Sequence, residues 1–138
     1  MVAAVERVAS SDPTLATLFL RAVATRQDPE AWAKAIETLS AKRWLDGDGV
    51  ALAAASAAVL LEKELEPVVS RFVAHDDPAV RRIALSVLEI VVGAKGWSPE
   101  RTQLLRRLRD DSSAWVAGAA AVVWPPREED PGFPDSRA

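Results

Sequence analysis

Hydrophobic residues recur at helical spacing along almost the whole chain, and no stretch of useful length alternates with the period of two that a β-strand would need. Glycine, proline and aspartate interrupt this pattern at intervals. Each segment between them carries a helix-start signal or ends at one of these residues. The pattern therefore predicts an all-α protein with eight helices.

Four of the eight helix starts are marked by Asp-Pro or Ser-Pro, in which the first residue caps the helix and proline fits its first turn. After Trp124, two prolines end the helical pattern. We therefore expect one helical domain over residues 1–126, and an acidic, proline-rich segment over residues 127–138 whose composition is typical of a disordered tail. The expected helices cover residues 2–9 and the segments that open at Asp12, Asp28 (to about Leu45), Asp48 (to about Lys63), Pro67, Asp77, Ser98 and Asp111.

Four capping aspartates recur at similar intervals, because Asp12, Asp48, Asp77 and Asp111 are 36, 29 and 34 residues apart. The helices that follow Asp12 and Asp77 carry apolar residues at matching positions, each pair separated by 65 residues. A helical hairpin cannot bury its own apolar face, whereas a stack of hairpins forms a continuous core. The spacing thus predicts four stacked hairpins, with the second, fourth, sixth and eighth helices on one surface and the other four on the opposite surface.

The expected fourth helix is apolar nearly all round. Small residues and valine occupy its predicted stripe, namely Ala51, Ala54, Ala55, Ala58 and Val59. Because such a helix has no polar face, we expect it to be covered on most sides, inside the stack or in an interface.

The segment Asp77-Pro78-Ala79-Val80-Arg81-Arg82-Ile83-Ala84 resembles the start of the second helix of a HEAT repeat, and Asp111-Ser112-Ser113-Ala114-Trp115-Val116 resembles it more loosely. The resemblance implies an α-α superhelix of the HEAT or armadillo type, a class that mostly binds proteins. It also implies that Arg81 pairs with a turn aspartate of a neighbouring repeat, which here is Asp48 or Asp111.

Composition excludes several classes of enzyme. The chain has no cysteine and a single histidine, so it offers neither a cysteine nucleophile, nor a Cys-ligated zinc site, nor a two-histidine mechanism. Its longest apolar stretch, residues 50–61, is shorter than the roughly 20 residues of a membrane span. Because the start of the chain also lacks the features of a secretory signal, we expect a cytoplasmic protein without cofactors. The 13 arginines and 26 alanines are typical of a GC-rich, bacterial genome.

Three short motifs fall short of a site. His75 precedes Asp76-Asp77 in a turn, as a general base might, but no nucleophile-bearing motif accompanies it. The segment Asp46-Gly47-Asp48-Gly49 is similar to half of a calcium loop, yet Ala57 stands where the bidentate glutamate belongs. The segment 93–96 lacks the spacing of a phosphate loop. We expect no catalytic, cofactor-binding or metal-binding residues.

Charge is distributed unevenly. Residues 67–109 carry eight basic and four acidic side chains, whereas the segments on either side are net acidic. Basic residues in this segment, several of them pointing away from the leucine face of the seventh helix, could bind an acidic partner, or they could simply form a solvated outer face. A pI of about 5.2 argues against nucleic acid. The candidate partner-binding residues are Arg71, Arg82, Lys95, Arg106, Arg107 and Arg109.

These observations predict a non-catalytic protein-protein interaction module, acting as a scaffold, adaptor or regulatory subunit and binding a protein partner through a solenoid surface. Two alternatives remain open. The first is a nucleic-acid-binding HEAT-like protein, distantly similar to DNA glycosylases, for which five tryptophans are available. The second is an immunity-type inhibitor of an enzyme. In each case the chain could be one subunit of a larger assembly.

Overall fold

The computed structural model describes residues 20–43, 45, 47–60 and 64–125, and within these ranges the chain is helical with no strand, which confirms the predicted all-α class. Residues 20–25 are helical. The expected helix over residues 2–9 and the cap at Asp12 lie outside the described residues, as does the tail from residue 127. The other elements are α3 (Pro29–Ala41), α4 (Gly47–Ala57) with a 3-10 turn (Ala58–Leu60), α5 (Glu66–Val73), α6 (Pro78–Lys95), α7 (Pro99–Arg109) and α8 (Ala114–Ala121).

Side-chain caps explain where three of these helices begin. The carboxylate of Asp28 accepts hydrogen bonds from the first N–H groups of α3, and the carboxylate of Asp77 does the same for α6. The hydroxyl of Ser98 accepts a bond from the backbone N–H of Arg101. Since proline follows each of these residues, the missing N–H costs the helix nothing.

Two of the predicted caps are wrong. Asp48 lies within the first turn of α4, which begins at Gly47. The N-cap of α8 is Ser113, and Asp111 lies two residues before it, where its carboxylate accepts a bond from the Ser113 N–H. In both turns several adjacent polar residues can cap, so the sequence alone does not fix which one does.

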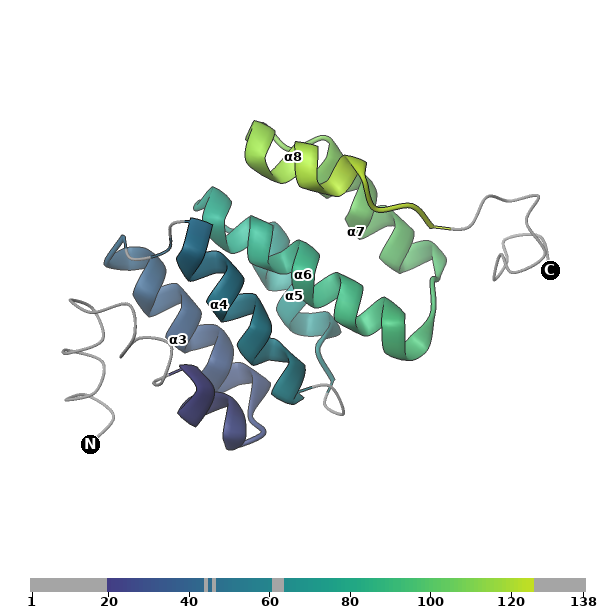
Figure 1. The fold of residues 1–138 in the computed structure, drawn as a ribbon. Coiled ribbons are helices and arrows are strands. Elements are labelled where there is room, and N and C mark those ends of the chain that lie inside the picture. Colours follow the sequence, from purple (N-terminus) through teal and green to yellow (C-terminus); the bar gives the residue numbers. More distant parts are fainter. Residues whose placement is uncertain (1–19, 44, 46, 61–63, 126–138) are drawn as a thin grey trace.

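The helices pack in two layers (Figure 1). In one layer α6 packs against α4 on one side and α8 on the other. In the other layer α5 packs against α3 and α7. The pairs α5–α6 and α7–α8 form hairpins that join the layers. The N-terminal ends of α4, α6 and α8 lie at the same end of their layer, so these helices run in a similar direction (Figure 1).

The core lies between the layers, and α6 contributes most to it. Val80, Ile83, Ala84, Val87 and Leu88, the stripe predicted after Asp77, are all buried.

Trp32 of α3 is fully buried against Phe72 of α5, with ring centroids 5.8 Å apart. Its indole N–H donates to the hydroxyl of Ser56 on α4 over 2.8 Å, and that hydroxyl donates to the carbonyl of Ala53. A buried hydrogen bond therefore connects the two layers inside an apolar core.

The predicted stripe of α4 is wrong. Within this helix and the following 3-10 turn, Val50, Ala53, Ala57 and Leu60 are buried, together with Gly49 and Ser56. Most of the predicted stripe is exposed, namely Ala51, Ala55, Ala58 and Val59. A helix that is apolar all round gives no periodic signal, so its orientation is set by packing against its neighbours.

Candidate functional site

Arg81 connects the N-terminal turn of α6 to the turn between α7 and α8. Its guanidinium donates two hydrogen bonds to the carboxylate of Asp111, over 2.7 and 3.1 Å, and two more to the carbonyls of His75 and Asp76. Asp111 is thus the partner of Arg81, of the two that the family resemblance implies. Burial of the Asp111 carboxyl opposes its ionisation, but hydrogen bonds from Arg81 and the Ser113 N–H, with the guanidinium charge, lower its pKa overall.

Asp77 makes the equivalent connection to the preceding hairpin. One oxygen of its carboxylate accepts from the Ala79 N–H, while the other accepts from the hydroxyl of Ser40 at the end of α3 over 2.5 Å. Together, Ser40–Asp77 and Arg81–Asp111 tie the start of α6 to the end of α3 and to the turn before α8. Both contacts join one helix to another.

Arg71 is engaged on the layer of odd-numbered helices. From α5 its guanidinium binds the carboxylates of Glu37 and Glu30 on α3, the latter over 2.9 Å. Hydrogen bonds to Glu37 and Glu30 raise the pKa of Arg71. The Arg71 guanidinium, a candidate for binding a partner, is thus already paired with carboxylates of the neighbouring helix.

Lys95 is also engaged, at the C-terminal end of α6. Its ammonium lies 3.1 Å from the carboxylate of Glu64 and 3.9 Å from that of Glu66. Glu66 in turn accepts from Arg101 of α7 over 2.6 Å. The hydrogen bond from Lys95, together with the Glu66 N–H, lowers the pKa of Glu64. This cluster joins the starts of α5 and α7 to the end of α6.

Arg109 serves the C-terminal end of α8. Its guanidinium donates to the carbonyls of Ala120 and Val123 and lies 4.9 Å from the ring centroid of Trp124. The carbonyls lie at the negative end of the helix dipole, where a cation is favourably placed. Arg109 thus does not project freely into solvent beside its neighbours on α7.

The remaining three candidates are less engaged. Arg82 donates one hydrogen bond to the hydroxyl of Ser86 on the same helix. Arg106 and Arg107 are exposed on α7, and no ion pair or side-chain hydrogen bond joins either of them to another described residue. Of the six basic residues proposed from the sequence, only these two remain as a freely exposed pair.

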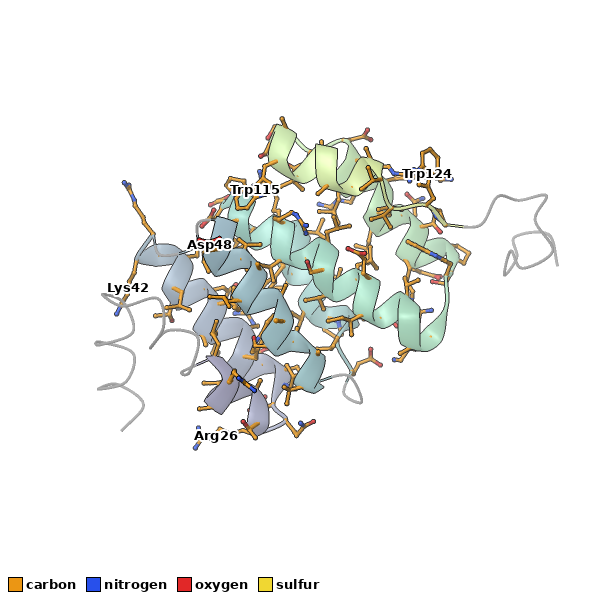
Figure 2. The ribbon with its side chains drawn as sticks, in the orientation of Figure 1. Arg26, Lys42, Asp48, Trp115 and Trp124 are labelled. Carbon is orange, nitrogen blue, oxygen red and sulfur yellow. The ribbon has the colours of Figure 1, made fainter. Side chains whose placement is uncertain are left out.

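Apolar side chains lie exposed on the other layer instead. Leu52 of α4 is 38% exposed, Val59 of the 3-10 turn 41%, and Trp115 of α8 41%. On α6, which packs against both α4 and α8, Arg82 is half-buried and Glu89 is exposed. We refer to these five residues as the even surface. Trp115 and Asp48 lie at the same end of this layer, whereas Trp124 lies at the far end of α8 (Figure 2).

The tryptophans divide by role. Trp32 is core, Trp97 is partly buried against the core, and Trp115 and Trp124 are exposed. Trp44 lies outside the described residues. Sequence reasoning did not single out Leu52, because the fourth helix was expected to be covered, and it counted Trp115 only as one of five tryptophans. The signal available was the apolar surplus of α4 and α8, which exceeds what one buried face needs.

Among the described residues no group of acidic and histidine side chains is arranged to hold a metal ion, and no helix combines the length and apolarity needed to cross a bilayer. Of the Asp46-Gly47-Asp48-Gly49 segment, Asp46 lies outside the described residues and the other three form the start of α4. No family model matches the chain, and neither a curated protein nor a solved structure matches it.

Proposed function

We propose that this protein is a non-catalytic interaction module, a scaffold, adaptor or regulatory subunit, built as a short HEAT-like α-solenoid. The order of the helices supports the architecture, since successive hairpins place α4, α6 and α8 in one layer and α3, α5 and α7 in the other. The Arg81–Asp111 pair, which bridges neighbouring hairpins over 2.7 Å, is of the kind that the resemblance implies.

The even surface carries the proposal. Leu52, Val59 and Trp115 each leave more than a third of their area in contact with water. Large apolar side chains that stay exposed on one layer of a domain are typical of protein-binding surfaces. Tryptophan in particular contributes strongly when it is buried in an interface. The partner is therefore a protein with an apolar face.

Arg106 and Arg107 provide a second candidate contact. They lie on α7, exposed and without a described acidic partner, and would favour an acidic protein. Their attraction would act on the rate of association more than on the final affinity, because exposed charges are screened by salt.

The environment of the single histidine supports a role without catalysis. The Nδ1 atom of His75 accepts a hydrogen bond from the Asp77 backbone N–H over 3.0 Å, and the Asp77 carboxylate is used by Ser40 and Ala79. Since these groups already bind one another, they form a turn and leave no general base directed at a nucleophile.

Affinity capture from the native source, with mass spectrometry of the captured proteins, tests the proposal when three variants are compared. The Leu52→Ser/Trp115→Ser variant should lose the partner, and Arg106→Glu/Arg107→Glu should weaken its capture mainly at low salt. Lys34→Ser, an exposed change on α3, is the control and should retain it. The Lys34→Ser and Arg106→Glu/Arg107→Glu variants should have free energies of unfolding within about 0.5 kcal/mol of the parent protein, because exposed substitutions rarely cost more. Circular dichroism should show that the Leu52→Ser/Trp115→Ser variant, which gives up partly buried apolar area, is still folded under the capture conditions.

Equal capture by all four proteins would show that neither surface binds. A salt titration with DNA and RNA distinguishes the nucleic-acid alternative, since phosphate contacts would give an affinity that falls steeply with salt.

A further inference from the structure

The charges of the even-numbered layer come almost entirely from α6. The sequence has no charged side chain over residues 49–61, which include most of α4 and its 3-10 turn, or over residues 112–126, which include α8. Three large apolar side chains of these segments stay exposed, namely Leu52, Val59 and Trp115. A molecule that covers this layer therefore meets apolar area on α4 and α8, and charge on α6.

Arg82 and Glu89 lie on the outer face of α6. Because successive residues of an α-helix are rotated by about 100°, Arg82, Ser86 and Glu89 fall within about 60° of one another. The buried residues Ala84 and Val91 lie on the opposite side of the helix. The hydrogen bond from the Arg82 guanidinium to the Ser86 hydroxyl, over 3.1 Å, follows the same outer face. Both charges thus point away from the core.

Neither of these charges is neutralised within the described part of the chain. No ion pair joins Arg82 or Glu89 to another described residue, and the hydrogen bond of Arg82 goes to the neutral Ser86. Seven residues separate the two, which is about 10 Å along the helix axis. A complementary partner must therefore offer an acidic group to Arg82, a basic group to Glu89 at the same separation, and apolar area beside them.

A second copy of this chain offers that combination. We propose that the protein forms a two-fold symmetric dimer through the even surface, in which Arg82 of each copy pairs with Glu89 of the other. A two-fold axis that lies in the interface and crosses α6 beside Ser86 makes the two α6 helices antiparallel and brings both pairs into register. This inference rests on the proposed function and identifies the protein partner as the chain itself.

The same rotation places apolar area against apolar area. It sets α4 over α4 and α8 over α8, and neither residues 49–61 nor residues 112–126 carry a charge that would repel its copy. An axis running along α6 would instead set Arg82 against Arg82 and Glu89 against Glu89, and like charges in contact oppose association. Charge therefore selects the antiparallel arrangement.

The even-numbered layer is large enough for a reversible dimer. Helix α6 has 18 residues, α4 has 11 and α8 has 8. Helices of these lengths, spaced by about 9 Å, cover roughly 500 Å² on each copy, or about 1,000 Å² for the pair. Specific interfaces begin at about this size. The dimer should therefore form at high concentration and dissociate on dilution.

Sedimentation velocity of the purified full chain tests the proposal. The parent should change from monomer to dimer between micromolar and near-millimolar concentration. Arg82→Glu would set acid against acid and Glu89→Arg base against base, so each should raise the dimer dissociation constant more than about tenfold. Lys34→Glu, at an exposed position of α3, makes the same change in net charge as Arg82→Glu and should dimerise as the parent does.

Recombining the two charges restores the pairs. An equimolar mixture of Arg82→Glu and Glu89→Arg should form a heterodimer, and the double variant Arg82→Glu/Glu89→Arg should dimerise by itself. Circular dichroism at low concentration checks that each variant is folded. A parent that stays monomeric, single variants that dimerise as the parent does, or a folded double variant that stays monomeric would each overturn the proposal.

Failure of the dimer can be distinguished from failure of the proposed function. A monomeric parent that captures a different protein, and loses it in Leu52→Ser/Trp115→Ser, would overturn the dimer and leave the interaction module standing. A parent that neither dimerises nor captures a protein through these residues would overturn both.

Discussion

The two layers of helices use their surfaces differently. On the odd-numbered helices, charged side chains bind one another across the layer, as Arg71 of α5 does with Glu30 and Glu37 of α3. On the even-numbered helices, packing is apolar, and Leu52 and Trp115 remain exposed. A surface whose charges are already paired gains little by binding a charged partner. Burying exposed apolar area in an interface, by contrast, is favourable. Most of the basic residues that attract attention in the sequence are thus engaged in contacts between helices.

The ends of α6 depart from this division. At its start the Ser40–Asp77 and Arg81–Asp111 contacts connect it to the hairpins on either side, and at its end Lys95 lies within the Glu64–Glu66–Arg101 cluster. Polar contacts in the even layer are thus concentrated where helices begin and end, and its middle is left to side chains without charge partners. The predictions below test this division by removing one kind of contact at a time.

The largest loss of stability is expected when a contact between the two layers is removed. Trp32→Ala should lower the free energy of unfolding by about 4 kcal/mol, since it removes a fully buried indole and leaves a cavity against Phe72. Trp32→Phe should cost much less, because it keeps most of the ring and removes chiefly the hydrogen bond to Ser56. Chemical denaturation of both variants measures the difference, and equal losses would mean that packing at this site contributes little.

A smaller loss is expected at the start of α6. Arg81→Met should cost about 3 kcal/mol, because it strands the carboxylate of Asp111, whose side chain is 7% exposed. Arg82→Met, one residue along, is the matched control and should cost under about 0.5 kcal/mol, since Arg82 bonds only to Ser86. Similar values for the two variants would show that the bidentate pair does not stabilise the stack.

Lowering the pH should also reveal how much the Arg81–Asp111 pair contributes to stability. Arg81 and the Ser113 N–H lower the pKa of Asp111 in the folded protein. The ionised Asp111 carboxyl therefore contributes fully to the free energy of unfolding above the ordinary carboxyl pKa of about 3.9. This contribution is lost as the pH falls through the lower pKa that the carboxyl has in the folded protein. In Arg81→Met this loss should disappear, because the carboxyl, then buried without its cation, is easier to protonate in the fold. Midpoints of denaturant unfolding, measured for the parent and for Arg81→Met between about pH 5 and pH 2.5, test this expectation.

The smallest loss in stability among these charged contacts is expected on the odd layer. Arg71→Met should cost under about 1 kcal/mol, since the Arg71 side chain is 35% exposed and solvent screens its ion pairs. High salt should reduce the difference between variant and parent. The same change at Arg107, which has no described ion pair, serves as the control, and a salt-independent loss at Arg71 would point to packing of its aliphatic stem.

The sequence predicts the helices well wherever a cap and a proline coincide. Asp28-Pro29, Asp77-Pro78 and Ser98-Pro99 each begin a helix at the expected residue, because capping depends on groups two or three residues away. The apolar stripe after Asp77 likewise identifies the buried face of α6. Where several polar residues are adjacent, as near the starts of α4 and α8, the tertiary structure determines where the helix begins.

What the sequence determines by itself is therefore local: helix class, most helix starts and the buried face of an amphipathic helix. The tertiary structure decides which charges are paired, because Arg71 meets Glu30 and Glu37 from 41 and 34 residues away, and Arg81 meets Asp111 from 30. It also decides which side of α4 is exposed, since a helix that is apolar all round can turn any face to the core. Local hydrogen bonding can be read from neighbouring residues, but exposure and charge pairing depend on residues that only the folded chain brings together.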